Sequence, residues 1–416
     1  MNTLQPVDSA HPDRWHALDA VRGAALLLGV LLHASLSYVP GAGYWYLVAD
    51  QSPSTALGGL FFVVHSFRML AFFLIAGLFA RLALERWGSA RFVADRVRRI
   101  ALPLLVGWTP VMIAIVAVIV WAAWIKGGGS LPQESPPGPA FTPDDFPLTH
   151  LWFLYVLLLM YVVALLVRAL LRLIDRADRL GRLGDRCVSV LLRGWAPLLL
   201  ALPLGWALTA TPKWTPWFGI PTPDHSLYPN LAAWVGFGMA FALGWAIHRQ
   251  APALLAAIER NRFTSLLTAL VGFVLCAGML GIAPAYAHEL GSAELRLYAI
   301  AYATMGWGLC LALTGFALRH LPGFSAPRRY LADASYWIYI VHLPILMALQ
   351  VVAAQFAAPW WIEYPLMLVI AMALMLAAYR WFVRGSWIGA MLNGRRYPAP
   401  PAAPTRSQPA PATEAA

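Results

Sequence analysis

Long apolar runs separated by polar loops dominate this chain. We count ten runs, each near the roughly twenty residues that an α-helix needs to cross a bilayer. They span approximately 17–38, 58–80, 100–125, 150–171, 190–210, 230–248, 264–286, 296–318, 334–356 and 363–383. The pattern predicts an all-α integral membrane protein with about ten transmembrane helices. Because ten is an even number, both termini are expected on the same side of the membrane.

The basic residues concentrate on one side of this predicted topology. Of the 30 lysines and arginines, almost all lie in the terminal segments and in every second loop. The opposite loops hold only Lys126, Lys213 and Arg296. Cytoplasmic loops of membrane proteins carry such an excess of positive charge, so both termini are predicted to be cytoplasmic.

The composition agrees with a membrane protein. The chain is 60% hydrophobic and only 12% charged, with a mean hydropathy of +0.64, values typical of a protein that crosses the membrane many times. The formal net charge of +11 is explained by the cytoplasmic loops, so we expect no nucleic-acid partner. The first run has charges inside it and no obvious cleavage site, and we interpret it as a retained span of a multi-pass protein of the cell inner membrane.

Three segments follow from these patterns. Residues 1–16 are predicted to be a short cytoplasmic segment, 17–385 the ten-helix membrane domain, and 386–416 a disordered, Pro/Ala-rich cytoplasmic tail. The three cysteines lack the spacing of a metal site, so no metal is predicted.

The first apolar run carries two ionisable residues on one face. Arg22 and His33 are eleven residues apart, which on an α-helix is about three turns and a rise of about 16 Å. The two side chains therefore point the same way, one near each membrane surface, and suggest a polar tunnel. The alternative is structural: Arg22 pairs locally with Asp19, and His33 is a hydrogen-bonded interior histidine.

A second pair of ionisable residues lies in the second run. His65 and Arg68 are three residues apart and share a helix face. If the first two runs pack together, His33, His65 and Arg68 form one buried polar cluster. Such groups are costly in a bilayer and are functional candidates for that reason, although a structural salt-bridge network would also account for them.

Three further features are weaker. Arg96 and Arg99 lie a helical turn apart at the inner end of the third run, where they can bind phosphates or simply follow the positive-inside rule. His342 lies about two turns from the cytoplasmic side of the ninth run, beside Pro344, and a structural role is the alternative. His150, at the outer end of the fourth run, is interpreted as interfacial.

These residues carry a resemblance to a known family. LDAVRG followed after ten residues by histidine resembles the R-x10-H hallmark of the membrane-bound acyltransferase 3 family. The segments HSFRMLAFFLIAGLF, HLWFLYVLLL and SYWIYIVHLPIL, and the R-x-x-R pair, are similar to signatures of that family in kind and place. The resemblance extends from about residue 14 to 385. HSFRM and HLWFL are similar to the branch that contains the glucans biosynthesis protein C, the succinyltransferase of osmoregulated periplasmic glucans.

The resemblance implies transfer of an acyl group from cytoplasmic acyl-CoA to a hydroxyl of an extracytoplasmic glycan. Succinyl-CoA or acetyl-CoA would be a co-substrate, with no permanently bound cofactor, and the other partners would be the glycan and the lipid bilayer. The family pattern assigns function to the motif Arg22 and His33. On this basis we predict two groups of site residues: the catalytic residues His33, Arg22, Arg68 and His65, and the donor-binding residues Arg22, Arg96, Arg99 and His342.

The expected chemistry follows from the side chains. His33 acts as general base on the sugar hydroxyl, and Arg68 and His65 stabilise the oxyanion or orient His33. An acyl-histidine intermediate is a second route. Two other functions fit the same sequence: an O-acetyltransferase of lipopolysaccharide or exopolysaccharide, and an exporter or flippase. The sequence has no convincing internal repeat, which weakens the transporter alternative.

Overall fold

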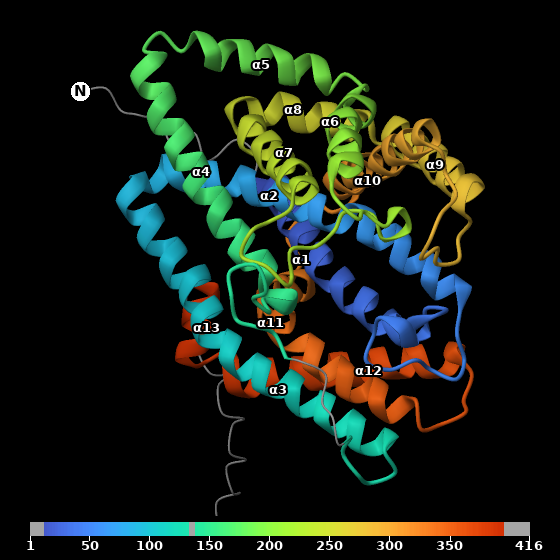
Figure 1. Ribbon diagram of the computed structural model, residues 1–416. Coiled ribbons are helices and arrows are strands. Elements are labelled where there is room, and N and C mark those ends of the chain that lie inside the picture. Colours follow the sequence, from blue (N-terminus) through green and yellow to red (C-terminus); the bar gives the residue numbers. More distant parts are fainter. Residues whose placement is uncertain (1–11, 133–137, 395–416) are drawn as a thin grey trace, which may run out of the picture.

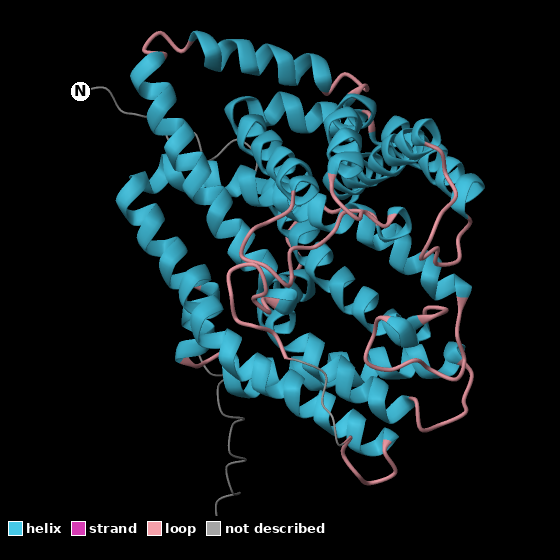
Figure 2. Cartoon of the chain, in the orientation of Figure 1, coloured by secondary structure: helices cyan, strands magenta, loops and turns pink. Residues whose placement is uncertain are grey.

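The computed structural model describes residues 12–132 and 138–394 (Figure 1). Within these residues the fold is helical, and the sole β feature is an isolated bridge between Thr142 and Asp145 (Figure 2). The α-helices are α1 (Pro12–Ser35), α2 (Thr55–Arg96), α3 (Leu102–Lys126), α4 (Trp152–Ile174), α5 (Arg179–Leu191), α6 (Ala196–Ala210), α7 (Leu231–Ile247), α8 (Ala251–Arg260), α9 (Arg262–Leu280), α10 (Ser292–His320), α11 (Ala326–Ala353), α12 (Trp360–Ala378) and α13 (Trp387–Asn393). The all-α prediction is therefore confirmed.

Eight helical stretches of the described chain are long and apolar enough to cross a membrane, or nine if the bent pair α5–α6 is one span. One of the eight, Thr55–Lys126, is 72 residues long and contains both α2 and α3. At about 1.5 Å per residue it measures about 108 Å, several times the thickness of a hydrocarbon core. This length is sufficient for more than one crossing. The exact number of ten spans stays a prediction.

Two breaks interrupt this long stretch. Gly88 has a positive φ of 77°, which glycine adopts without steric strain, and Val97–Ala101 forms a π-helical segment. The sequence predicted a loop after residue 80, whereas α2 continues to Arg96. This is a correction: arginines are good helix formers and do not by themselves end a helix.

The fifth predicted span, 190–210, is not one straight helix. It divides into the end of α5 and the whole of α6, which meet at 108°. Gly194 lies in the turn between them with φ 124°, a conformation that favours glycine. At 15 residues, α6 is about 22 Å long.

The predicted tail also contains structure. Residues 387–393, which we assigned to a disordered tail, form α13, whose N-cap Ser386 accepts a hydrogen bond from the Ile388 N–H. The remainder of the predicted tail, 395–416, and most of the predicted N-terminal segment, 1–11, lie outside the described residues.

α1 lies at the centre of the bundle, packed against α2 and α11 (Figure 1). α10 is also enclosed, between α6 and α9, and 78% of its most apolar window is buried. Because other helices surround α1, its ionisable residues face protein and not lipid. Ionisable residues are tolerated at membrane depth under this condition.

α2 and α7 cross closely because each places a glycine against the other's backbone. A Cβ on Gly77 would overlap the carbonyl oxygen of Phe241, and a Cβ on Gly244 would overlap that of Leu74. Small residues at both sides of a crossing let two helices approach until their backbones touch, which is a common basis of helix packing in membranes.

Contacts between loops agree with the predicted sides of the membrane. Arg249, after α7, pairs with Asp185 of α5 at 2.8 Å, and both lie on the predicted cytoplasmic side. On the other side, Trp45 donates a hydrogen bond to the Tyr286 hydroxyl at 2.7 Å. The orientation of the termini stays a prediction.

The α2–α7 crossing gives a stability prediction. We expect Gly77→Ala to destabilise the protein by about 1–3 kcal/mol, because the added methyl group forces the two helices apart. The matched control is Gly278→Ala in α9, where a Cβ meets no atom within 4 Å. The measurement is the apparent unfolding temperature in detergent. Equal unfolding temperatures for the two variants would contradict the close crossing.

Candidate functional site

Three histidines from three helices meet in the interior. The ring centroids of His33 (α1) and His342 (α11) are 5.1 Å apart, and those of His342 and His150 are 5.0 Å apart. His342 is 2% exposed and His150 7%. His150 lies in the single 3₁₀ turn Thr149–Leu151, immediately before α4. We call His33, His342 and His150 the histidine cluster.

Backbone carbonyls fix the tautomers of two of these rings. His342 Nδ1 lies 2.7 Å from the Tyr339 carbonyl oxygen, and His150 Nε2 lies 3.0 Å from that of Ile340. Because a carbonyl oxygen only accepts, a neutral ring carries its proton on the nitrogen that faces it. His342 Nε2 is then a lone-pair acceptor, and it is fully enclosed without a hydrogen-bond partner among the described residues.

His33 is held through its backbone and not through its ring. The Gln350 side-chain amide donates to the His33 carbonyl oxygen at 2.9 Å. The enclosed ring nitrogen Nδ1 has no hydrogen-bond partner in the described part of the chain. An enclosed nitrogen without a partner is costly, so the ring is available to a ligand and is not satisfied by the protein.

Arg68 adds a buried cation beside His33. Its side chain comes from α2, is 8% exposed, and has no carboxylate partner among the described residues. Its Nη1 lies 2.7 Å from the position that a Cβ on Gly29 would occupy. Gly29 is one turn before His33 on α1, so the glycine leaves the space in which the guanidinium lies near His33.

Among the described residues, the His65 ring makes no ring contact with the histidine cluster. Its ring stacks on Phe61, with centroids 5.3 Å apart, and its Nε2 lies 3.1 Å from the Ile220 carbonyl oxygen. The predicted cluster of His33, His65 and Arg68 is therefore present in part. Arg68 reaches α1, whereas His65 packs against a neighbouring aromatic ring and a loop carbonyl.

Arg22, Arg96 and Arg99 share a second polar site. They line a cavity of about 120 Å³ between α1, α2, α4 and α11. Arg22 is 34% exposed in its side chain, Arg99 29% and Arg96 18%. The sequence predicted that these arginines act together, and the structure brings them together.

Acidic residues partly neutralise these arginines. Asp19 pairs with Arg22 at 3.2 Å, as expected from their spacing, and Asp95 lies 3.0 Å from Arg96 and 3.8 Å from Arg99. Three cations against two carboxylates leave one positive charge in excess, so the cavity favours an anion. α13 closes one side, where the Leu392 carbonyl oxygen accepts a hydrogen bond from Arg99 Nε at 3.3 Å.

Aromatic rings separate the arginine cavity from the histidine cluster. Phe72 and Phe153 line the cavity, with ring centroids 4.3 Å apart. Phe153 contacts Tyr339 at 5.3 Å, and Tyr339 contacts His342 at 6.1 Å. The cavity lining stops at these rings and does not include His33. The two sites therefore share α1 and α11, and the lining of the arginine cavity does not extend to His33.

The structure changes two of the sequence-based placements. His342 lies beside His33 and not beside the arginines, because α11 begins at Ala326, eight residues before the predicted start. His342 is thus sixteen residues, or about 24 Å, into its helix. His150, interpreted as interfacial, is buried in the cluster. Its position in the HLWFL segment was the signal that could have identified it.

Neither placement creates a metal site. Within the described ranges, no group of three or more histidine, cysteine, aspartate or glutamate side chains could hold an ion.

Comparison with known proteins identifies the family. The family model described as acyltransferase domain, acyltransferase 3, matches residues 15–380. The chain belongs to this acyltransferase family. The match runs from within α1 to just beyond α12, so the histidine cluster and the three cavity arginines lie within it, and the resemblance seen in the sequence is confirmed. The protein is accordingly an O-acyltransferase of the membrane.

Two of the curated relatives share one name. The chain is 25% identical over 391 residues to the glucans biosynthesis protein C of Shigella boydii serotype 4 (strain Sb227), covering 92% of this chain and 95% of the relative. It is 24% identical over 391 residues to the glucans biosynthesis protein C of Escherichia coli O17:K52:H18 (strain UMN026 / ExPEC), again covering 92% of this chain and 95% of the relative. No solved structure gives a significant match.

Gly29 provides a test of the site geometry. We expect Gly29→Ala to lower acyl transfer about a hundredfold, because its methyl group displaces the Arg68 guanidinium and misplacement by about 1 Å is enough for such a loss. The matched control is Gly23→Ala on the same helix, where the nearest atoms, in Ala332, are at ordinary contact distance. The measurement is the rate of acyl transfer by membranes that contain equal amounts of each variant. Comparable rates for the two variants would contradict a role for Arg68.

Proposed function

We propose that this acyltransferase moves an acyl group, most simply succinyl, from cytoplasmic acyl-CoA to hydroxyls of a periplasmic glucan at the cell inner membrane. The observation that carries the proposal is the pairing of an arginine cavity and a histidine cluster on the same two helices, α1 and α11. The name of the curated relatives supports glucan as the acceptor.

The arginine cavity is the proposed donor end. Arg22, Arg96 and Arg99 offer a net positive charge at the arginine-rich side of the membrane, where charge-assisted hydrogen bonds to phosphates are strong. A volume of about 120 Å³ does not hold a nucleotide, so phosphates would bind at its mouth and only the narrow pantetheine arm would extend inward.

The acyl group must then pass the aromatic layer. Arg22 and His33 are about 16 Å apart along α1, a distance comparable to an extended pantetheine arm. Phe72 and Phe153 close the cavity in the present conformation. We infer that the bound arm displaces these rings, and that without donor they keep water and protons from passing between the two sides.

The histidine cluster is the proposed reaction centre. His33 removes the proton from a sugar hydroxyl as the oxygen attacks the thioester carbon, a role worth about 10²–10⁴-fold in rate. The carbon–sulfur bond then breaks, and the CoA thiolate takes the proton back from His33. Arg68, which has no carboxylate partner among the described residues, stabilises the oxyanion that forms on the carbonyl oxygen.

We infer that His342 supports His33. Its Nδ1–H is fixed on the Tyr339 carbonyl, and its free Nε2 is enclosed beside the His33 ring. As an acceptor, His342 Nε2 favours the His33 tautomer whose N–H faces it, and in that tautomer the other His33 ring nitrogen carries the lone pair for the incoming hydroxyl. His65 does not contact the reacting atoms in this proposal. Its ring binds the Ile220 carbonyl oxygen and so holds the loop that contains Ile220 against α2.

The first prediction concerns the reaction centre. His33→Ala is expected to abolish the acyl increment on periplasmic glucans, and His342→Ala to reduce it at least about tenfold, because the base or its support is lost. The readout is mass spectrometry of glucans from cells that express each variant. The control is His225→Ala, whose side chain is 76% exposed in an outer loop. Acyl-free glucans in the wild type, with an increment on another envelope glycan, would contradict glucan as the acceptor.

The second prediction concerns the donor end. Arg99→Gln is expected to raise the KM for acyl-CoA about tenfold or more while leaving kcat within about threefold, because a hydrogen bond to a charged group is lost from binding and not from chemistry. Arg98→Gln is the matched control, since Arg98 is exposed between the two cavity arginines. Equal KM values for the two variants would contradict phosphate binding in this cavity.

A further inference from the structure

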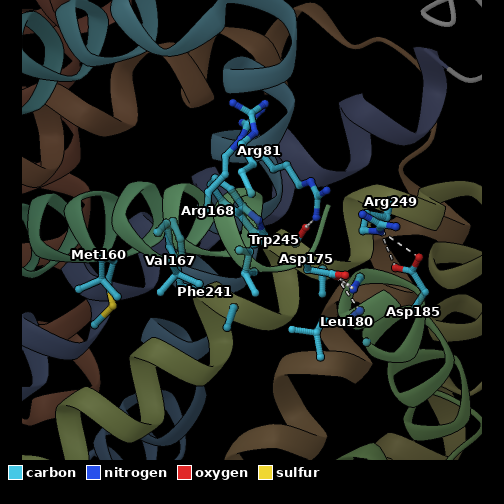
Figure 3. A pocket seen from close by; sticks show the side chains of 18 of the residues that line it. Arg81, Met160, Val167, Arg168, Asp175, Leu180, Asp185, Phe241, Trp245 and Arg249 are labelled. Carbon is cyan, nitrogen blue, oxygen red and sulfur yellow. Dashed lines mark hydrogen bonds and ion pairs between the residues drawn. The ribbon is translucent and has the colours of Figure 1, made fainter. Parts of the chain in front are cut away.

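A larger cavity lies on the other face of α4. It has a volume of about 760 Å³ and is bounded by α2, α4, α5 and α7 (Figure 3). On α4, Leu157 and Tyr161 line the arginine cavity, whereas Met160, Val167 and Arg168 line the larger one. The proposed function does not use this second cavity, which we call the α4–α7 groove.

The groove is apolar at one end and charged at the other. Figure 3 shows Met160, Val167 and Phe241 together at one end, and the ion pair of Arg249 and Asp185 at the other. Pockets with apolar walls and a few placed charges are typical ligand sites, and this division matches the chemistry of an amphiphile.

α5 indicates the level of the groove in the membrane. One stripe of this helix is basic and another is apolar: Arg179, Arg182 and Arg186 form the first, and Leu180, Leu183 and Leu191 the second. α5 is bent by 108° from α6. A strongly amphipathic helix that turns away from a span lies in the plane of the lipid headgroups. The charged end of the groove, beneath α5, is therefore at headgroup depth.

Most charges in the groove are paired within the protein. Arg249 bonds to Asp178 and Asp185, and the hydrogen bond from Arg249 lowers the pKa of Asp178. Arg81 pairs with Glu85 at 2.7 Å. These pairs define the structure of the charged end. The fourth carboxylate of the lining, Asp175, accepts hydrogen bonds from the backbone N–H groups of Arg179 and Leu180.

Two arginines of α4 form no such ion pair among the described residues. Arg168 and Arg172 lie one turn apart on the groove face. Arg168 Nη1 is fully enclosed, and no hydrogen-bond partner for it exists among the described residues. Arg172 has no carboxylate partner in that part of the chain either. Arg168 and Arg172 are thus neighbouring cations without a hydrogen-bonded carboxylate of their own among the described residues, although the Glu85 carboxylate, which pairs with Arg81, also lies near Arg168. Two such guanidinium groups suit an anionic group.

We propose that the α4–α7 groove binds an anionic phospholipid from the arginine-rich leaflet. The phosphate lies between Arg168 and Arg172, and an acyl chain extends along Val163, Val167 and Phe241. The outer surface of α4 next to the groove is exposed and apolar, at Val162, Leu166 and Leu170, so a lipid can enter sideways from the bilayer. A soluble phosphate would leave the apolar end empty.

The test uses the full-length protein in detergent, titrated with dioleoyl-phosphatidylglycerol and followed by native mass spectrometry. The Arg168→Gln/Arg172→Gln variant is expected to bind the lipid about thirtyfold more weakly, because two cations at the membrane surface are lost. The matched control is Arg176→Gln, which removes an exposed arginine of the same loop region that does not line the groove, and which should bind as the wild type does.

A second variant tests the apolar end without removing a charge. Ala242 lines the groove and is exposed, so Ala242→Trp fills the space between α4 and α7 while the core remains intact. It should weaken lipid binding at least about tenfold and leave the unfolding temperature of the lipid-free protein unchanged. Equal lipid binding by the wild type and the double arginine variant would overturn the proposal. Displacement of the lipid by glycerol 3-phosphate would also overturn it, because the site would then be one for a free phosphate.

Discussion

The need to accommodate ionisable side chains in an apolar interior governs the arrangement of this protein. A charged or strongly polar group at membrane depth persists only where protein partners or a ligand compensate for the lost water. Backbone carbonyls bind His150 and His342, and a space left by Gly29 accepts Arg68. His33 Nδ1 and Arg68 Nε have no hydrogen-bond partner among the described residues, and these two side chains lie together where α1 meets α2.

The rest of the bundle serves that arrangement. α1 and α11 run side by side through the centre and carry both polar sites, one near the arginine-rich side and one deeper. The close crossing of α2 and α7 fixes the helix that supplies Arg68. Aromatic rings lie between the two sites. In the proposed reaction the acyl group must pass these rings to reach an acceptor on the other side.

Much of this could be predicted from the sequence because helical periodicity is local. The eleven-residue spacing places Arg22 and His33 on one face whatever surrounds them, and Arg96 and Arg99 follow from a spacing of three. The position of His342 could not be derived in this way, because the start of α11 depends on a polar segment that joins the helix. His150 was missed because only tertiary packing turns its side chain from the membrane surface into the cluster. The bend between α5 and α6 depends on one turn around Gly194, which an apolar run does not reveal.

The most direct test of the account is acyl transfer by the purified protein in lipid nanodiscs. Succinyl-CoA and periplasmic glucan are supplied together and separately, and free CoA and modified glucan are measured over time. The account predicts that CoA is released in equal amount to the succinyl groups gained by glucan, only when both substrates are present, and that His33→Ala abolishes both products. Glucan modification at the wild-type rate by His33→Ala would contradict the central claim, as would an absence of CoA release with every acyl-CoA and glycan tried.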